Sequence, residues 1–487
     1  MTRRTKPLDQ AIADTHNPDS RLRRDLTWWD LTVFGVSVVI GVGIFTLTAS
    51  TAGNVAGPAI AVSFVIAAVA CGLAAMCYAE FASAVPVAGS AYTFSYIVFG
   101  ELVAWILGWD LILELVVAAA VIARSWSGYL GTVLGVGRLT TDFLATPIDW
   151  GAVLIVAAVT ALLAFGAKVS AKVSLVITVV KVSVVVLVIV VGAFYIRVAN
   201  YFPFIPPAEY TGDRAEQSVL SLITNAGSSH YGWYGLLAGA SIVFFSFIGF
   251  DIVATTAEET RRPQRDVPRG ILASLLFVTV LYIAVVVVLT GMVKYTTLRA
   301  AGDDANLATA FTANGMNWTA HIISLGALAG LTTVQIVVLF GQARLLLAMS
   351  RDGLIPRWLA RTSRRGAPVR ITMLGGTVVA AVAALFPIER LAEMVNIGSL
   401  FAFTLVSAGV IWLRRARPDL PRGFKVPLMP LVPLCSVVAL LWLMLNLSAL
   451  TWIRFVVWLG GGLIIYGLYG RRRSLLADGV PAEVARR

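Results

Sequence analysis

Residues 40–45 of the chain read Ile-Gly-Val-Gly-Ile-Phe, near the middle of an apolar stretch over about residues 30–52. Two glycines there weaken a helix unless a neighbouring backbone packs closely or the helix opens. Close packing of small residues is the ordinary explanation for glycine in a membrane helix. A second interruption, Phe-Ser-Phe-Ile-Gly-Phe-Asp at residues 245–251, lies in the apolar stretch 235–257. The pair of interruptions favours opened helices.

Apolar residues dominate the whole chain. Its 487 residues are 58% hydrophobic and 13% charged, and the mean hydropathy is +0.85. A spanning helix needs about 20 apolar residues, which predicts an all-α polytopic membrane protein with about 12 transmembrane helices and no soluble enzyme domain. The predicted spans lie near residues 30–52, 57–82, 97–131, 150–167, 171–197, 235–257, 269–293, 316–350, 370–387, 391–413, 428–448 and 451–470.

The net charge is +12, and the basic residues are distributed as the predicted topology requires. The charge therefore does not indicate nucleic-acid binding. With the N-terminus in the cytoplasm, 28 of the 38 Lys and Arg residues fall in inner segments, 7 in outer segments and 3 within spans. The positive-inside rule then places both termini in the cytoplasm and the protein in the plasma membrane, with lipid headgroups as partners of the basic segments. The polar residues 1–26 do not resemble a cleavable signal peptide.

Several other classes of protein are disfavoured. The three cysteines lie in apolar stretches and the three histidines are scattered, so we expect no disulfide framework, metal site or cofactor. A membrane-embedded enzyme needs a nucleophile, a metal cluster or paired carboxylates at one depth, and a channel needs polar stripes on several helices with a filter sequence. Neither pattern is evident, so we expect a transporter and not an enzyme.

Five spans separate the starts of the two interrupted helices. The second half of the chain therefore has inverted orientation, as in transporters built from inverted repeats whose broken helices meet near the midplane. We predict a basic cytoplasmic tail (1–27), a first five-helix repeat (28–197), an extracytoplasmic loop (198–234), a second inverted repeat (235–413), two last helices (414–470) and a cytoplasmic tail (471–487).

Several motifs carry a resemblance to a known family. They are Gly-Val-Gly-Ile-Phe at 41–45, Val-Pro-Val-Ala-Gly-Ser-Ala-Tyr at 85–92, the stretch 244–251 with 257–260 and 263–268, and Gly-Gln-Ala-Arg at 341–344 followed by 349–356. They resemble the amino acid/polyamine/organocation (APC) superfamily, and the later motifs resemble its cationic amino acid transporter branch, which includes bacterial amino acid permeases. The resemblance implies a LeuT-like fold, a five-plus-five inverted repeat with broken helices 1 and 6 and two extra helices.

The polarity of each break and the resemblance together predict a site for L-amino acids. The substrate carboxylate is expected on the backbone N–H groups of Gly41, Val42, Gly43 and Ile44. The amino group is expected on the carbonyl oxygens of Phe245, Ser246 and Ile248. Members of the family often carry a hydroxyl or another small residue where this chain has Val42, so binding there depends on the backbone alone.

Lys181 lies about ten residues into the fifth span, about 15 Å deep at 1.5 Å per residue. It shares one helical face with Ser174 and Thr178, and intramembrane charges are usually functional. The alternative is a lysine held by backbone carbonyl groups for packing. The resemblance implies that the amine lies against the first broken helix, where related transporters bind sodium, and couples transport to a proton.

Further polar residues fall within predicted spans. We expect Glu114, one turn after Asp110, to serve structure or gating more than direct substrate contact. Asp251 follows the second break and either caps it or reaches a cationic side chain, with capping favoured. Gln335, Thr332 and Thr333 either face the substrate site or form hydrogen bonds with one another across helices. Arg124 is expected at the interface, with its head in water.

The predicted function is secondary active transport of L-amino acids by alternating access and proton symport. The resemblance favours cationic substrates, whereas the apolar site favours small neutral ones, and an exchanger of the same fold is a further alternative. The expected partners are the amino acid, the proton and the bilayer, and the oligomeric state stays open.

Overall fold

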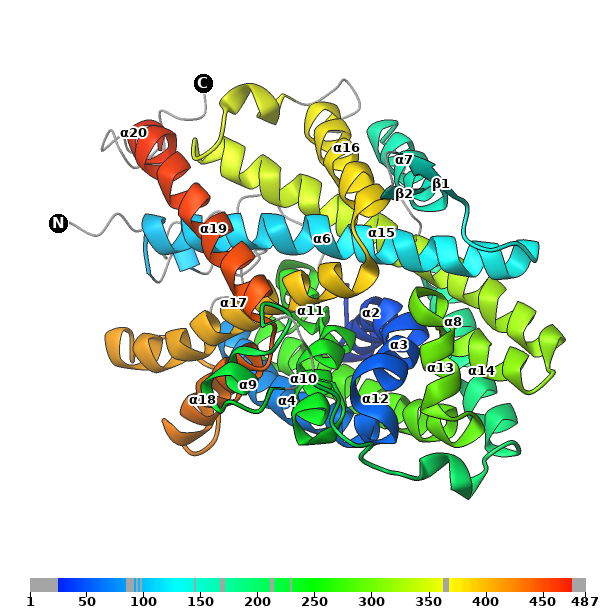
Figure 1. Ribbon diagram of the computed structural model, residues 1–487. Helices are drawn as coiled ribbons and strands as arrows, with labels where there is room; N and C mark the ends of the chain where they lie inside the picture. Colours follow the sequence, from blue (N-terminus) through cyan, green and yellow to red (C-terminus); the bar gives the residue numbers. More distant parts are fainter. Residues whose placement is uncertain are drawn as a thin grey trace.

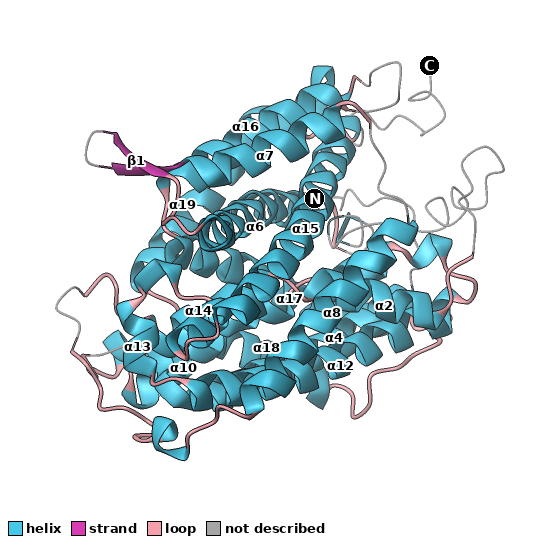
Figure 2. Ribbon diagram, turned by 90° about the vertical axis from the view of Figure 1, so that its right-hand side faces the viewer, coloured by secondary structure: helices cyan, strands magenta, loops and turns pink. Residues whose placement is uncertain are grey.

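The computed structural model describes residues 25–84, 92, 95–96, 99–143, 146–166, 171–210, 214–227, 230–361 and 368–474. Most of the N-terminal tail and residues 85–91 of the second motif lie outside these ranges. The described chain is helical apart from short loops and one antiparallel hairpin, β1 (Thr140–Phe143) with β2 (Thr146–Asp149). Figure 2 shows this hairpin projecting beside α7 (Trp150–Ala164) and α16 (Val369–Leu385).

Eight helical segments of the described chain are long and apolar enough to cross a membrane, and four shorter apolar helices accompany them. The shorter ones are α2 (Trp28–Val39), α7, α16 and α18 (Leu431–Leu445). The long segments contain α4 (Ile60–Ala84), α6 (Glu101–Leu134), α8 (Ala171–Ala193), α10 (Gly232–Val243), α12 (Pro263–Met292), α15 (Asn317–Arg351), α17 (Ile388–Ala416) and α19 (Ala449–Ile465). The chain is a multi-pass membrane protein, as its composition predicts.

Short elements join or interrupt these helices. They are η1 (Gly43–Leu47), α3 (Thr48–Thr51), η2 (Ala52–Ala56), α9 (Val219–Ile223), η5 (Phe244–Phe247), α11 (Phe250–Thr255), α13 (Tyr295–Ala300), α14 (Leu307–Ala313) and α20 (Arg471–Arg473). One helical run extends from η1 to the end of α4, and its backbone leaves helical geometry at Gly57 (φ 63°, ψ −152°). Glycine adopts this conformation without the strain that a side chain adds.

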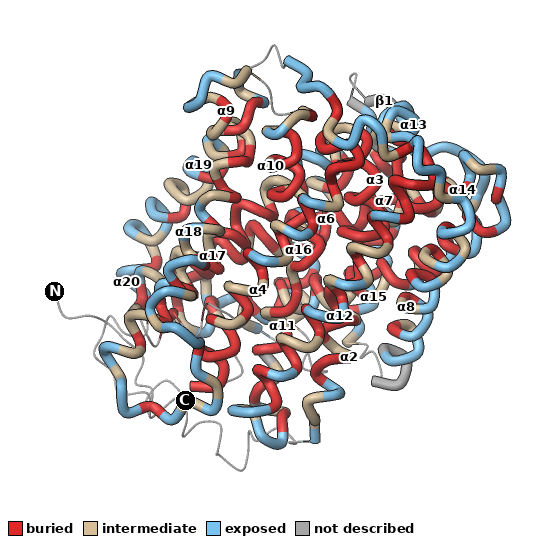
Figure 3. Tube along the Cα trace, turned by 90° about the horizontal axis from the view of Figure 1, so that it is seen from below, coloured by how far each residue is buried: buried red, intermediate tan, exposed pale blue. Residues whose placement is uncertain are grey.

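The centre of the molecule is built on two long helices, α6 and α15, which pack along each other (Figure 1). A Cβ on Gly108 of α6 would lie 2.9 Å from the Met349 methyl group of α15, so the backbones approach closely. Near the other end of the pair, the Trp126 indole donates a hydrogen bond to Thr332 Oγ1 at 3.1 Å. Buried segments gather around α3, α4 and α10, whereas α8, α14 and α19 have exposed outer faces (Figure 3).

One end of the molecule, which we call the basic end, holds both ends of the described chain. Leu26 pairs with Thr260, and Ser474 Oγ donates a 2.6 Å hydrogen bond to Glu101 at the start of α6. Gly423, in the loop between α17 and α18, packs on Gln264 at the start of α12. Together with residues 351–370, whose Gly353 packs on the Arg473 carbonyl, these segments carry 16 of the 27 Lys and Arg residues in the described ranges, so the positive charge is concentrated at this end.

The opposite end is closed by loops. The Tyr231 N–H donates to the Val55 carbonyl at 2.6 Å, and Arg299 forms a bidentate ion pair with Glu209 at 2.7 and 2.9 Å. Hydrogen bonds from the guanidinium lower the pKa of the exposed Glu209 carboxyl. These contacts hold the loop before α10 against the end of η2.

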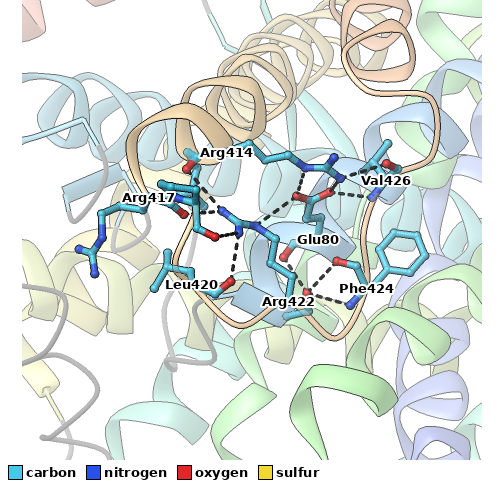
Figure 4. Close-up of polar contacts among 10 residues, drawn as sticks. Glu80, Arg414, Arg417, Leu420, Arg422, Phe424 and Val426 are labelled. Atoms are coloured by element: carbon cyan, nitrogen blue, oxygen red, sulfur yellow. Dashed lines mark hydrogen bonds and ion pairs between the residues drawn. The ribbon is translucent and has the colours of Figure 1, made fainter.

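At the basic end, a buried carboxylate joins α4 to the end of α17 and to the α17–α18 loop (Figure 4). Glu80, near the end of α4, is 1% exposed and accepts hydrogen bonds from Arg414 Nε at 2.6 Å and Nη2 at 2.5 Å. The Val426 N–H donates to the same carboxylate at 2.6 Å. Arg422 donates to the carbonyl groups of Leu420 and Arg417 at 3.0 and 2.7 Å, which fixes the shape of the α17–α18 loop, while the Val426–Glu80 bond holds that loop on α4.

This arrangement predicts that Arg414→Met destabilises the protein, because the buried Glu80 loses its bidentate partner while Arg422 Nε stays 3.6 Å away. Removal of one partner of a buried pair costs about 3–5 kcal/mol. We expect a clear fall in the thermal unfolding temperature of the purified protein in detergent. The control is Arg417→Gln, whose pair with Asp419 is exposed and screened by water, so its loss should hardly change stability. Equal shifts in the two variants would contradict the buried role of Glu80.

Candidate functional site

The first predicted break is present in the structure. Helix α2 ends at Val39, Ile40 has extended geometry (φ −70°, ψ 96°), and helical structure resumes at Val42. No side chain caps the resumed helix, whose first N–H groups lack intrahelical partners. The Val39 carbonyl, freed by the break, accepts a 2.7 Å hydrogen bond from the Tyr282 hydroxyl. The break is therefore fastened from outside its own helix.

The second break lies between η5 and α11. Ile248 is extended (φ −64°, ψ 139°), and Gly249 has φ 120°, a conformation that side chains rarely adopt. The Phe245 carbonyl accepts a hydrogen bond from the Ile248 N–H at 3.2 Å and keeps one lone pair available. Helix α10 thus ends with carbonyl groups at the break, and α11 begins with N–H groups there.

The two breaks touch. A Cβ on Gly43 would overlap the Cα, Cβ and Oγ atoms of Ser246, and a Cβ on Gly249 would lie 2.9 Å from Val38. The Ser246 hydroxyl is buried without a hydrogen-bond partner in the described part of the chain. The structure thus brings together the two backbone segments that were predicted to hold the substrate.

Lys181 lies beside the first break. Its Nζ donates a 2.8 Å hydrogen bond to the Ser37 carbonyl, in the last turn of α2. The side chain is 1% exposed, and its stem packs on Gly330 of α15, where a Cβ would lie 2.9 Å from Lys181 Cγ. One turn further along α15, Val334 contacts Gly41. The lysine is therefore enclosed between α2, α8 and α15.

Three carboxylates form a separate group, which we call the carboxylate cluster: the buried Asp110 and Glu114 and the half-buried Asp251. Asp110 and Glu114 face α17, since a Cβ on Gly398 would lie 2.9 Å from Asp110 Oδ1. Asp251 interacts electrostatically with Glu114 and lies beside the N–H groups of Gly249 and Ile252 at the start of α11; its capping role stays a prediction. Within the described residues, no Lys or Arg pairs with the cluster, and each member has an oxygen without a hydrogen-bond partner.

Gln335 is fully buried on α15, and both of its amide atoms lack hydrogen-bond partners among the described residues. Its neighbours Thr332 and Thr333 bond to carbonyl groups of their own helix at 2.7 Å. The prediction for Arg124 is wrong, because its side chain is buried and donates to the Ala383 carbonyl at 3.1 Å. The last turn of α16 supplies the acceptor that water was expected to supply.

Two tyrosines at the breaks were missed by the sequence analysis. Tyr282 binds the Val39 carbonyl, and the buried Tyr129 donates to the Phe45 carbonyl. Tyr129 also accepts from the Leu307 N–H at 3.3 Å, which links the break to α14. No local pattern marks either residue, since each contact joins helices far apart in the sequence.

Comparison with known proteins identifies the family of the chain. The family described as amino acid permease matches residues 26–468. The chain belongs to this family. The resemblance to the APC superfamily is therefore confirmed, and the known relatives are transporters.

Three relatives illustrate the range of the family. The permease is 42% identical to the branched-chain amino acid permease BcaP of Bacillus subtilis, over 97% of this chain and 98% of the relative. It is 39% identical to the methylthioribose transporter of the same organism, over 97% and 98%. It is 37% identical to the vacuolar cationic amino acid transporter 4 of Arabidopsis thaliana, over 85% of this chain and 67% of the relative.

The contact between the breaks gives a direct test in the permease. In Gly43→Ala the new methyl group must displace Ser246, and overpacking of this kind costs about 1–3 kcal/mol. We expect uptake of labelled amino acid into proteoliposomes to fall by about tenfold or more, with the protein still folded. Gly72→Ala in α4 is the matched control, because its methyl group would meet no atom within 4 Å and the residue lies outside both breaks. Normal uptake by Gly43→Ala would show that transport does not depend on the contact between the two breaks.

Proposed function

We propose that the permease is a secondary active transporter of L-amino acids, coupled to protons and working by alternating access in the plasma membrane. The observation that carries this proposal is the contact between Gly43 and Ser246, which joins two broken helices deep in an apolar body. A helix opens at such depth only where its backbone groups are buried in protein or line a polar cavity. Two meeting breaks supply the free backbone groups that an amino acid needs.

Each end of an amino acid has a complementary set of backbone groups. The first turn after the Ile40 break presents N–H groups and the positive end of a helix dipole, which suit the substrate carboxylate at residues 41–44. The end of η5 presents the carbonyl groups of Phe245, Ser246 and Ile248, which suit the ammonium group. Substrate binding then requires Gly43 and Ser246 to separate, which moves the half-helices attached to them.

Lys181 supplies the coupling in this proposal. When protonated, it donates a charge-assisted hydrogen bond to the Ser37 carbonyl and holds α2 against α8. When neutral, the amine makes a weaker bond, so α2 is freer to move. Proton release and movement of α2 are thereby linked, since each protonation state favours a different position of the half-helix.

Two substrate classes have support. The carboxylate cluster supports cationic amino acids, because its oxygens would bind a cationic side chain. The apolar residues around the breaks, among them Ile44, Phe244 and Phe247, support branched-chain or other neutral substrates, in keeping with the name of one relative. Equilibrium binding of arginine, lysine, ornithine, alanine and leucine to the purified protein distinguishes the two classes.

The orientation and the repeat are part of the same proposal. We place the basic end, and with it both termini, in the cytoplasm, because Lys and Arg favour the inner side of a membrane. The two five-helix repeats (28–197 and 235–413) each begin with an interrupted helix, and the segment 414–470 adds two further spans. The loop 198–234 then lies outside.

The coupling role predicts the behaviour of Lys181→Met, which keeps the volume of the side chain and removes the titrating amine. An inward proton gradient should no longer drive accumulation of substrate in proteoliposomes. Exchange down a substrate gradient should survive, because the backbone groups at both breaks are untouched. Wild-type uptake should not depend on sodium, since the ammonium group occupies the position that a sodium ion would need.

The control for this experiment is Lys294→Met, which removes an exposed lysine at the opposite end and should leave coupling unchanged. Gradient-driven accumulation by Lys181→Met would refute the coupling role of the lysine. Strict sodium dependence of the wild type would refute the idea that the lysine replaces the ion.

A further inference from the structure

The connection between α15 and α16 at the basic end contains a short helix, η8 (Arg357–Ala360). Figure 1 shows it between α20 and the start of α16. Gly353, between α15 and η8, packs on the Arg473 carbonyl of α20, and a Cβ on Gly353 would lie 3.3 Å from Arg357 Nη2. The Arg357 side chain and the end of α20 therefore lie beside the same glycine.

A third arginine reaches η8 from α16. Arg370, the second residue of α16, donates a 3.3 Å hydrogen bond from Nη1 to the Trp358 carbonyl. Three separate segments of the chain thus place Arg357, Arg370 and Arg473 around η8. We call these three residues the arginine group.

The arginine group keeps N–H donors available for a ligand. All three side chains are exposed, and none forms an ion pair with a carboxylate in the described part of the chain. The Arg473 guanidinium lies over the Tyr469 ring at 5.2 Å, and such stacking leaves its N–H edge free. The neighbouring carboxylate of Asp352 accepts a 2.6 Å hydrogen bond from the Tyr92 hydroxyl. The positive charge of the group is therefore not neutralised by these contacts.

Exposed apolar surface begins next to the arginine group. Met373 and Leu374, three and four residues after Arg370, share its face of α16 and are exposed, as is Val378 one turn further on. Trp358 is also exposed, and tryptophan favours the boundary between lipid tails and headgroups. Positive charge at the edge of a lipid-facing surface matches a molecule with an anionic head and acyl chains.

We propose that the arginine group binds the headgroup of an anionic phospholipid, whose acyl chains lie along the exposed face of α16. Guanidinium groups bind phosphate oxygens through paired, charge-assisted hydrogen bonds. Phosphatidylcholine has the same phosphate, but its choline cation is repelled by the arginines. The site differs from the general attraction between basic segments and headgroups, because side chains from three segments bind one molecule. A bound lipid joins α16, η8 and α20, so it stabilises the folded protein.

Native mass spectrometry of the whole chain in neutral detergent tests this site, with phosphatidylglycerol and phosphatidylcholine as probes. We expect the wild type to retain phosphatidylglycerol in preference to phosphatidylcholine. Arg357→Gln and Arg370→Gln should each weaken the apparent affinity for phosphatidylglycerol by about tenfold. The matched control is Arg415→Gln in the last turn of α17, which removes an exposed positive charge at the same end but outside the arginine group.

Thermal unfolding of the same proteins provides a second measurement. Without lipid, both variants should unfold at the wild-type temperature, because the replaced side chains are exposed. Added phosphatidylglycerol should raise that temperature less in the variants than in the wild type. Unchanged affinity in both variants, or equal weakening by Arg415→Gln, would contradict a specific site. Equal retention of phosphatidylcholine, or equal stabilisation by inorganic phosphate, which lacks acyl chains, would contradict an anionic lipid as its ligand.

Discussion

The missing side chain at Gly43 lets two interrupted helices touch, and the rest of the site depends on that contact. The backbone at Gly43 lies directly on Ser246, and on the inner side Gly249 lies on Val38. Neither approach leaves room for a Cβ. The Val39 carbonyl, released by the first break, accepts a hydrogen bond from the Tyr282 hydroxyl, and the Phe45 carbonyl just after the break accepts one from the Tyr129 hydroxyl; both tyrosines belong to helices outside the pair. The breaks are thus supported on all sides, although they interrupt two helices of the core.

The charged groups in the core are held in two different ways. Lys181 is hydrogen-bonded to a backbone carbonyl of α2 and enclosed by α15, so its amine faces a backbone dipole. The carboxylate cluster has no described Lys or Arg partner and keeps unpaired oxygens. Buried charges without partners are costly, which favours either a bound proton or a cationic group of the substrate.

Much of this architecture follows from the sequence. The apolar stretches predict the helices, and the glycines at residues 41 and 43 predict the first break, because both signals are local. The prediction for Arg124 was wrong because its hydrogen-bond acceptor comes from α16, a helix far away in the sequence. Tyr129 and Tyr282 were missed because their acceptors also lie on helices distant in the sequence. The sequence pattern does not show how the helices are rotated relative to one another. It therefore cannot predict the contacts that depend on that rotation.

The central claim is that substrate binds between the two breaks. A structure of the permease determined with saturating transported amino acid tests it most directly. The account predicts that Gly43 and Ser246 separate, with the substrate carboxylate within hydrogen-bond distance of the N–H groups of residues 41–44 and the ammonium group on the carbonyl end of η5. A substrate bound elsewhere, with Gly43 still packed against Ser246, would contradict it.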